Sequence, residues 1–166
     1  MKKIIYLACL VLALSAKGYA DDKNKSEKKN AEVSYFAENN FMTKYEGAKN
    51  VNWTVTSQFQ KAAFTLDGTK MAAFYDVNGD YIATTQYVSV DKLPAISKSK
   101  LKKVYGDYSV VEVVRYDFDG QDDAHLDLLT GKRSYNTIYF ASLQKENEKI
   151  VVKITPDGEV SYLKTL

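Results

Sequence analysis

Acidic side chains that could bind a metal ion are concentrated in one short stretch of the sequence, YDFDGQDDAHLD. This stretch contains Asp117, Asp119, Asp122, Asp123 and Asp127, and carboxylate oxygens are the ligands that Ca²⁺ prefers. An EF-hand loop does not fit, because the sixth position from Asp117 is an aspartate instead of glycine and the twelfth is a leucine instead of glutamate. We therefore predict an acidic surface loop. A calcium site on Asp117, Asp119, Asp122 and Asp123 is the alternative.

The only histidine of the chain, His125, lies in the same stretch. A catalytic group of this kind needs a nucleophile and a base that a rigid scaffold holds within hydrogen-bonding distance. A loop histidine among carboxylates does not meet that requirement, and zinc sites rarely take most of their ligands from carboxylates. The sequence predicts no catalytic residue, no enzymatic activity and no cofactor.

A second set of oxygen ligands alternates in FYDVNGDYIATT, residues 74–85. Asp76, Asn78 and Asp80 have the spacing of the first ligands of a calcium loop. Glycine falls at the fourth position from Asp76, however, and the twelfth is Tyr87, so an EF-hand loop is excluded here too. The pair Asn78-Gly79 is a strong hairpin signal. We predict a tight turn between two strands.

The first 20 residues have the pattern of a secretory signal peptide. Lys2 and Lys3 precede an apolar run at residues 4–16, and Gly18-Tyr19-Ala20 supplies small residues for cleavage after Ala20. A lipoprotein with Cys9 as the modified residue is the alternative. Residues 21–30 are all polar or charged and predict a flexible leader. We expect a periplasmic or secreted protein without a membrane span in the mature chain.

Charge and cysteine content exclude two further classes of protein. Of the 23 basic residues three lie in the first 20 residues, which contain no acid, so the mature chain has 20 basic and 21 acidic residues. This balance argues against nucleic-acid binding. The single cysteine, Cys9, leaves with the signal peptide, so a disulfide framework is excluded.

The remaining sequence alternates between helical and strand periodicity. Apolar residues recur at helical spacing in two stripes. Gly47 marks the end of the first helix, and Asp91 and Pro94 mark the start of the second. Strand-like runs follow each stripe, separated by turn dipeptides such as Asp67-Gly68 and Asp157-Gly158. The two stripes are Val33, Phe36, Ala37, Phe41 and Tyr45, and then Leu93, Ile96, Leu101, Val104 and Tyr105.

These patterns predict an α+β fold of two tandem repeats. Each repeat, 31–89 and 90–166, has one helix followed by a four-stranded antiparallel meander, with a polar insertion at about 120–136 in the second repeat. The helices should pack on one face of the sheets, since each helix and each sheet has one apolar face to bury. The opposite face should stay open to water or to a partner.

The sequence resembles the PepSY-like family that is related to the β-lactamase inhibitor protein (BLIP-like). The resemblance spans about residues 31–166 and is carried by YEGAKNVNWTV, FQKAAFTLDGTKMAAFYDVNGDYIATT, DKLPAI and YFASLQKENEKIVVKITPDGEVSYL. It implies a secreted, usually periplasmic protein, a fold of helix-plus-four-strand repeats and no catalytic residues. It also implies binding to other proteins. The disulfides of the inhibitor protein are missing here, so β-lactamase inhibition is not carried over.

The candidate partner-binding residues are aromatic and threonine side chains on the predicted open face. By strand alternation these are Phe74, Tyr116, Tyr139, Thr54 and Thr56, and aromatic groups in polar surroundings are typical of protein interfaces. We predict a non-enzymatic module that binds a protein or peptide there, and an inhibitor is one form that such a module takes. The alternative is a small-ligand or calcium-binding protein that uses a pocket between the lobes or the acidic 117–127 loop.

Overall fold

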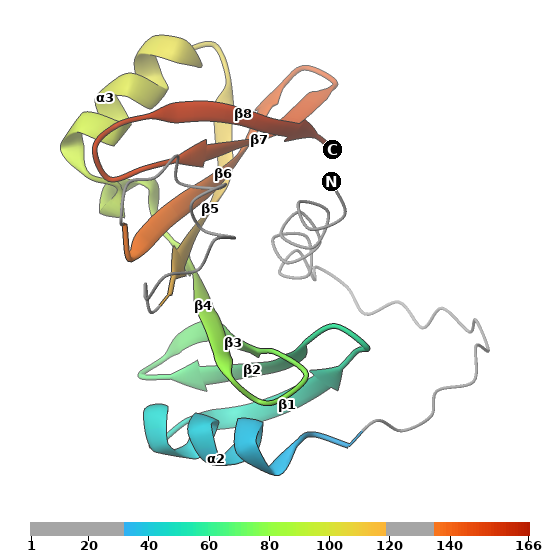
Figure 1. Cartoon of the computed structure of the whole chain (residues 1–166). Coiled ribbons are helices and arrows are strands. Elements are labelled where there is room, and N and C mark those ends of the chain that lie inside the picture. The colour runs from blue at the N-terminus through green and yellow to red at the C-terminus, as the bar shows by residue number, and fades with distance from the viewer. Residues whose placement is uncertain (1–31, 119–134) are drawn as a thin grey trace. The chain divides into compact units, whose positions relative to one another are not determined.

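The computed structural model describes residues 32–118 and 135–166, which form two α-helices, one 3-10 helical turn and eight strands. In chain order (Figure 1) these are α2 (Tyr35–Lys44), β1 (Lys49–Val55), β2 (Gln60–Leu66), β3 (Thr69–Tyr75), β4 (Tyr81–Val88), η1 (Val90–Lys92), α3 (Ala95–Val104), β5 (Ser109–Asp117), β6 (Thr137–Lys145), β7 (Glu148–Ile154) and β8 (Val160–Thr165). Among these residues no helix is long and apolar enough to cross a membrane.

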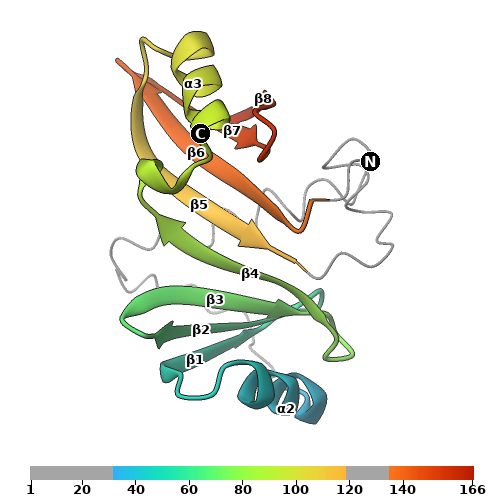
Figure 2. The ribbon, with the colours of Figure 1, turned by 90° about the vertical axis from the view of Figure 1, so that its left-hand side faces the viewer.

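The eight strands form one antiparallel sheet in the order β1 to β8, so that each strand pairs with its neighbours in the sequence (Figure 2). The ladder continues through the middle of the chain. There β4 pairs with β5 from Thr84 opposite Asp117 to Val88 opposite Val113.

The prediction of two tandem repeats, each with its own four-stranded meander, is therefore wrong. Separate meanders would leave one edge of β4 and one edge of β5 with unpaired backbone N–H and C=O groups, and such exposed edges invite aggregation. Pairing β4 with β5 satisfies both edges and joins all eight strands into a single sheet.

Helix α2 begins and ends where local hydrogen bonds replace the missing helical ones. The Ser34 hydroxyl oxygen accepts a hydrogen bond from the Ala37 N–H at 3.2 Å, and Gly47, with a φ of +80°, turns the chain away after the helix. Ala37 and Phe41 are buried, as is Tyr45 directly after the helix. Phe36, predicted on the same face, is 66% exposed instead, because only positions 37, 41 and 45 recur every four residues toward the sheet.

Helix α3 packs on the sheet through Ser97 and Leu101, with Tyr105 half-buried behind them. Ile96 and Val104, predicted on the apolar stripe, are exposed. Asp91 does not cap this helix: it lies within η1, whose first turn is capped by the hydroxyl of Ser89.

The turn at residues 76–80 joins β3 to β4, which confirms the predicted hairpin. One carboxylate oxygen of Asp76 accepts hydrogen bonds from the N–H groups of Asn78 and Asp80, at 2.8 and 2.9 Å. Gly79 adopts a φ of +94°. Asp76 therefore stabilises its own turn. Thr155 has the corresponding role in the β7–β8 turn, where its hydroxyl accepts from the Glu159 N–H at 3.0 Å.

Cross-strand partners assign each side chain to one of two faces of the sheet. Both helices lie on one face, here called the helix face, where two apolar clusters form under α2 and under α3. The opposite face is called the far face, and no helix of the described residues lies over it. One line of neighbouring positions on the far face runs across β2 to β6: Ala63, Ala72, Thr85, Tyr116 and Ile138.

Candidate functional site

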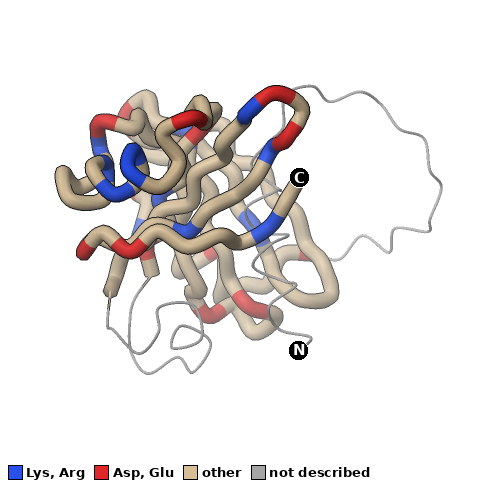
Figure 3. The backbone as a smooth tube through the Cα atoms, turned by 90° about the horizontal axis from the view of Figure 1, so that it is seen from above, with Lys and Arg blue, Asp and Glu red and all other residues tan. Residues whose placement is uncertain are grey.

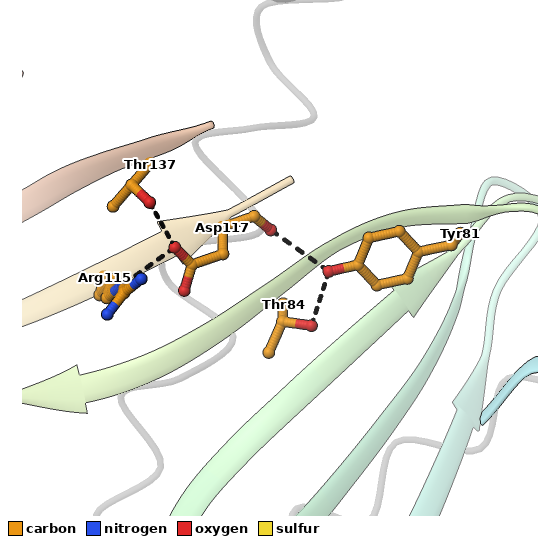
Figure 4. Close-up of polar contacts among 5 residues, drawn as sticks. All are labelled: Tyr81, Thr84, Arg115, Asp117 and Thr137. Atoms are coloured by element: carbon orange, nitrogen blue, oxygen red, sulfur yellow. Dashed lines mark hydrogen bonds and ion pairs between the residues drawn. The ribbon is translucent and has the colours of Figure 1, made fainter. Parts of the chain in front are cut away.

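A polar strip separates the two apolar clusters of the helix face, on strands β4 to β6 (Figure 4). One carboxylate oxygen of Asp117 accepts hydrogen bonds from the Thr137 hydroxyl at 2.6 Å and from Arg115 Nε at 2.9 Å. The ion pair is half-exposed, with 41% and 27% of the Arg115 and Asp117 side chains accessible. Solvent therefore screens it, and its contribution to stability is small.

A chain of hydroxyl groups links this strip to α2. The Tyr81 hydroxyl contacts the Thr84 hydroxyl at 2.7 Å and donates to the Asp117 carbonyl oxygen at 3.4 Å. Tyr45 hydrogen bonds to the same Thr84 hydroxyl, and the ammonium of Lys44 lies 3.6 Å from the centre of the Tyr81 ring. The strip thus fixes the end of α2 on the centre of the sheet.

The hydroxyl of Tyr75 lies next to this network but has no hydrogen-bond partner. Tyr75 is fully buried among the side chains under α2, against Trp53 and Tyr81. Burial raises the pKa of Tyr75 far above its usual value, and the neighbouring Tyr45 raises it further. Histidine and cysteine do not occur among the described residues, so neither Tyr75 nor the strip is accompanied by an imidazole base or a thiol nucleophile there.

Aromatic and apolar side chains form the centre of the far face. Phe74 and Tyr116 both lie there, as the sequence predicted from strand alternation, and their Cα partners include Ala83 and Ile138. Both side chains have low exposure, 0% and 3%. Phe74 packs edge-on against Phe59, while Tyr116 packs against Phe118 and Phe140.

The other three predicted binding residues lie elsewhere. Thr54 is exposed on the far face at the outer strand β1, opposite Lys61. Thr56 is exposed just beyond β1, and its hydroxyl holds a turn by hydrogen bonds to Phe59, at 2.9 Å to the carbonyl oxygen and 3.0 Å from the N–H. Tyr139 lies on the helix face, in the cluster under α3. The structure thus brings Phe74, Tyr116 and Thr54 onto one face.

Charged groups border the aromatic centre of the far face. Partial burial lowers the pKa of Lys61. Glu112 accepts a hydrogen bond from the Ser142 hydroxyl at 3.1 Å. Burial raises the pKa of Tyr87 to about 12, and the carboxylate of Glu112 raises it as a second cause. An apolar centre with a charged border is the usual composition of a protein-binding surface.

The possible metal ligands are not brought together in the described part of the chain. Asp117 is engaged by Arg115 and Thr137, and the described residues contain no group of three potential ligands from His, Cys, Asp and Glu. Asp119, Asp122, Asp123, Asp127 and His125 lie outside the described residues. An open hollow lies at the β6–β7 turn, lined by Lys145, Glu146, Asn147 and Glu148, at the end of a hairpin.

The sequence predicts neither the polar strip nor the unpaired hydroxyl of Tyr75. The strip exists only because β4 pairs with β5, which sets Thr84 opposite Asp117. Periodicity within each strand contains no information on that pairing. The sequence predicts that Tyr75 lies on an apolar strand. It does not predict an unpaired hydroxyl, because a buried tyrosine hydroxyl is usually hydrogen-bonded.

Comparisons with known proteins show the fold. No protein-family model and no curated protein matches the chain. A BLIP-like protein from Bacteroides fragilis is 14% identical, with a TM-score of 0.66 over 84% of this chain and 92% of its own. A DUF2874 family protein from Bacteroides ovatus is 20% identical, with a TM-score of 0.65 over 81% and 87% of the two chains.

A third similar structure, from Bacteroides eggerthii, is described as a candidate periplasmic protein. It is 16% identical, with a TM-score of 0.64 over 81% of this chain and 88% of its own. At such identities the likeness establishes a shared fold alone. This chain therefore has a BLIP-like fold, and the PepSY part of the resemblance is not supported.

Proposed function

We propose that this chain is an exported, non-enzymatic module that binds a protein or peptide on the far face of its sheet. The observation that carries the proposal is the composition of that face. Phe74, Tyr116 and Phe140 lie at its centre, each at most 3% exposed, so they form an apolar base and are not exposed anchors. The groups that a partner can reach lie around this base: Thr54 is exposed on β1, and Lys61 and Glu112 are half-buried at the border. A polar rim around an apolar centre is the composition of many protein-binding surfaces. The candidate periplasmic and BLIP-like descriptions of the structural neighbours are in accord with it.

The proposal includes export. Residues 1–20 would be removed after Ala20, and residues 21–30 would form a linker before the folded part, because their composition offers nothing to bury. Intact mass measurement of the exported protein tests this directly. A mass that still includes residues 1–20, or a lipid on Cys9, would contradict it.

The binding face is tested with two variants of matched composition. Asn52→Arg/Thr54→Arg adds two large cations at exposed positions of β1 on the far face, whereas Asn39→Arg/Thr43→Arg makes the same change on the exposed side of α2. Protein is captured from a periplasmic extract by each purified variant and by the unchanged protein. We expect the β1 variant to lose at least about tenfold of the captured partner, since buried unpaired charge costs several kcal/mol.

The α2 variant should capture the same partner in the same amount as the unchanged protein. Equal capture by both variants would place the binding surface away from the far face. Circular dichroism of both variants confirms that the fold is kept.

A further inference from the structure

Lysine is concentrated on one of the two helices. Helix α3 has the sequence AISKSKLKKV, with Lys98, Lys100, Lys102 and Lys103 and no acidic residue. Helix α2 has one acid and one lysine, Glu38 and Lys44. Figure 3 shows the Lys and Arg positions gathered along the α3 coil. A cationic surface of this kind is therefore local to α3.

The lysines lie on the side of α3 that points away from the sheet. Ser97 and Leu101 are buried against the strands, whereas Lys100, Lys102 and Lys103 are exposed. Lys98 is half-buried, and its ammonium donates to the Asp91 carbonyl oxygen at 3.5 Å. Lys92, just before the helix, is exposed as well.

Helix stability accounts for only part of this charge. Lys102 and Lys103 lie in the last turn, where cations interact favourably with the helix dipole. Lys98 and Lys100 lie before that turn. In the described part of the chain no ion pair neutralises any of the four, because the nearby Asp107 binds Lys145. The four charges remain available to an external anionic surface.

The kind of charge and its neighbours favour a lipid surface over a protein. Lysine is depleted in protein interfaces, which prefer arginine and aromatic residues. Near anionic lipids, by contrast, each lysine contributes through its charge alone and needs no fixed partner. Ile96 and Val104 are 52% and 56% exposed among the lysines. Lysine mixed with exposed aliphatic groups is the pattern of helices that lie on a membrane surface.

We propose that the exposed side of α3 binds the surface of a membrane that contains anionic phospholipids. The far face of the sheet is on the opposite side from α3, so a protein bound at the membrane presents that face to the aqueous phase. Lipid binding does not depend on the proposed partner. The two proposals can therefore fail separately.

The test uses protein purified after export, so that its natural processing has taken place, and vesicles of phosphatidylglycerol and phosphatidylethanolamine in equal parts. At low salt the unchanged protein should sediment with the vesicles, and it should not sediment with vesicles of phosphatidylcholine. Lys100→Gln/Lys103→Gln should lower the partition coefficient about 25-fold, which corresponds to about fivefold for each lysine near the surface.

A matched control removes two exposed lysines from β1 and β3, Lys49→Gln/Lys70→Gln. It should change the partition coefficient less than about twofold, although the net charge changes equally. Three outcomes would overturn the proposal: no binding of the unchanged protein to anionic vesicles at low salt, equal loss in the two variants, or equal binding to neutral vesicles. Absence of vesicle binding together with α3-dependent capture of an acidic protein would assign the lysines to a protein partner instead.

Discussion

Helices α2 and α3, each with the strands and the turn that it packs on, form two regions of the molecule that are here called the two helix corners. The two corners have the same architecture but different exposed surfaces. Toward the sheet, α2 presents Ala37 and Phe41 while α3 presents Ser97 and Leu101, all of them buried. Each helix ends on a tyrosine whose N–H donates to a carbonyl four residues earlier, at 2.9 Å for Tyr45 and 2.8 Å for Tyr105.

The exposed positions of the two helices differ in kind. Where α2 has Tyr35, Phe36 and Met42, each more than 60% exposed, α3 has lysines with a single large aliphatic residue at either end. Packing against the sheet constrains one side of each helix and leaves the other side free. The two corners can therefore differ in function on these free sides rather than on the buried ones.

The two corners differ most in the space around their turn glycines, Gly79 and Gly158. A methyl group at Gly79 would lie 2.7 Å from the Ala37 backbone nitrogen, whereas one at Gly158 would meet the flexible Ile96 side chain at 3.0 Å. Both glycines have positive φ, so each alanine variant is strained. Gly79→Ala should cost about 4 kcal/mol of unfolding free energy and Gly158→Ala about 2 kcal/mol. Urea unfolding measures both, and equal losses would show that the corners are equally tight.

The hydrogen bond that joins each helix to its turn should differ in strength. Ser97 donates from a buried position to the Thr155 carbonyl oxygen at 2.8 Å, and Asn40 donates from an exposed position to the Gly79 carbonyl oxygen at 3.0 Å. Ser97→Ala should cost about 1 kcal/mol, because it removes a buried hydrogen bond and leaves the Thr155 carbonyl oxygen with the Gly158 N–H, at 3.1 Å, as its remaining donor, and Asn40→Ala should cost about 0.5 kcal/mol. Thermal unfolding of the two variants compares them. A larger loss for Asn40→Ala would reverse the order.

The smallest effect concerns the Tyr75 hydroxyl under α2, which has no hydrogen-bond partner. Tyr75 is the last residue of β3. The last residue of the corresponding strand under α3, β7, is Ile154, which has no hydroxyl. Near pH 8 Tyr75→Phe should change stability by at most about 1 kcal/mol, since the lost hydroxyl has no partner. Because burial raises the pKa of Tyr75, its proton stays bound in the folded state while the unfolded state loses it above about pH 10. The folded protein therefore loses stability as pH rises above that value.

The alkaline loss should be smaller in the Tyr75→Phe variant. Between about pH 8 and pH 11 the variant should lose about 1 kcal/mol less than the unchanged protein. Chemical unfolding at the two pH values measures the difference. Parallel losses in both proteins would mean that Tyr75 titrates alike in the folded and unfolded states.

Local features of the fold could be predicted from the sequence because they depend on neighbouring residues. The Asn78-Gly79 turn and the inward positions of Phe41 and Leu101 are of this kind. The continuous sheet could not be predicted, because the β4–β5 ladder joins residues such as Thr84 and Asp117, which lie on either side of η1 and α3. Strand alternation likewise does not reveal which of the two faces of the sheet a helix covers.

The candidate site shows the same division. Alternation predicts Phe74 and Tyr116 on one face, and the cross-strand partners place them there. Alternation predicts Tyr139 on that face too, but its Cα partners Arg115 and Ile154 are on the helix face. Strand β6 is buried on both faces, with Ile138 and Tyr139 both buried. Apolar residues at both parities leave alternation without a polar side to identify the exposed face.

The strand order bears on how the chain acquires its structure as it emerges during synthesis. Because every strand pairs with the strand before it in the sequence, a chain that emerges from its N-terminus always has the template for the next strand already in place. No pairing has to wait for the C-terminal end, and short sequence separations between contacts favour fast folding. The strands therefore emerge in the same order in which they pair, and the sheet grows at one edge at a time.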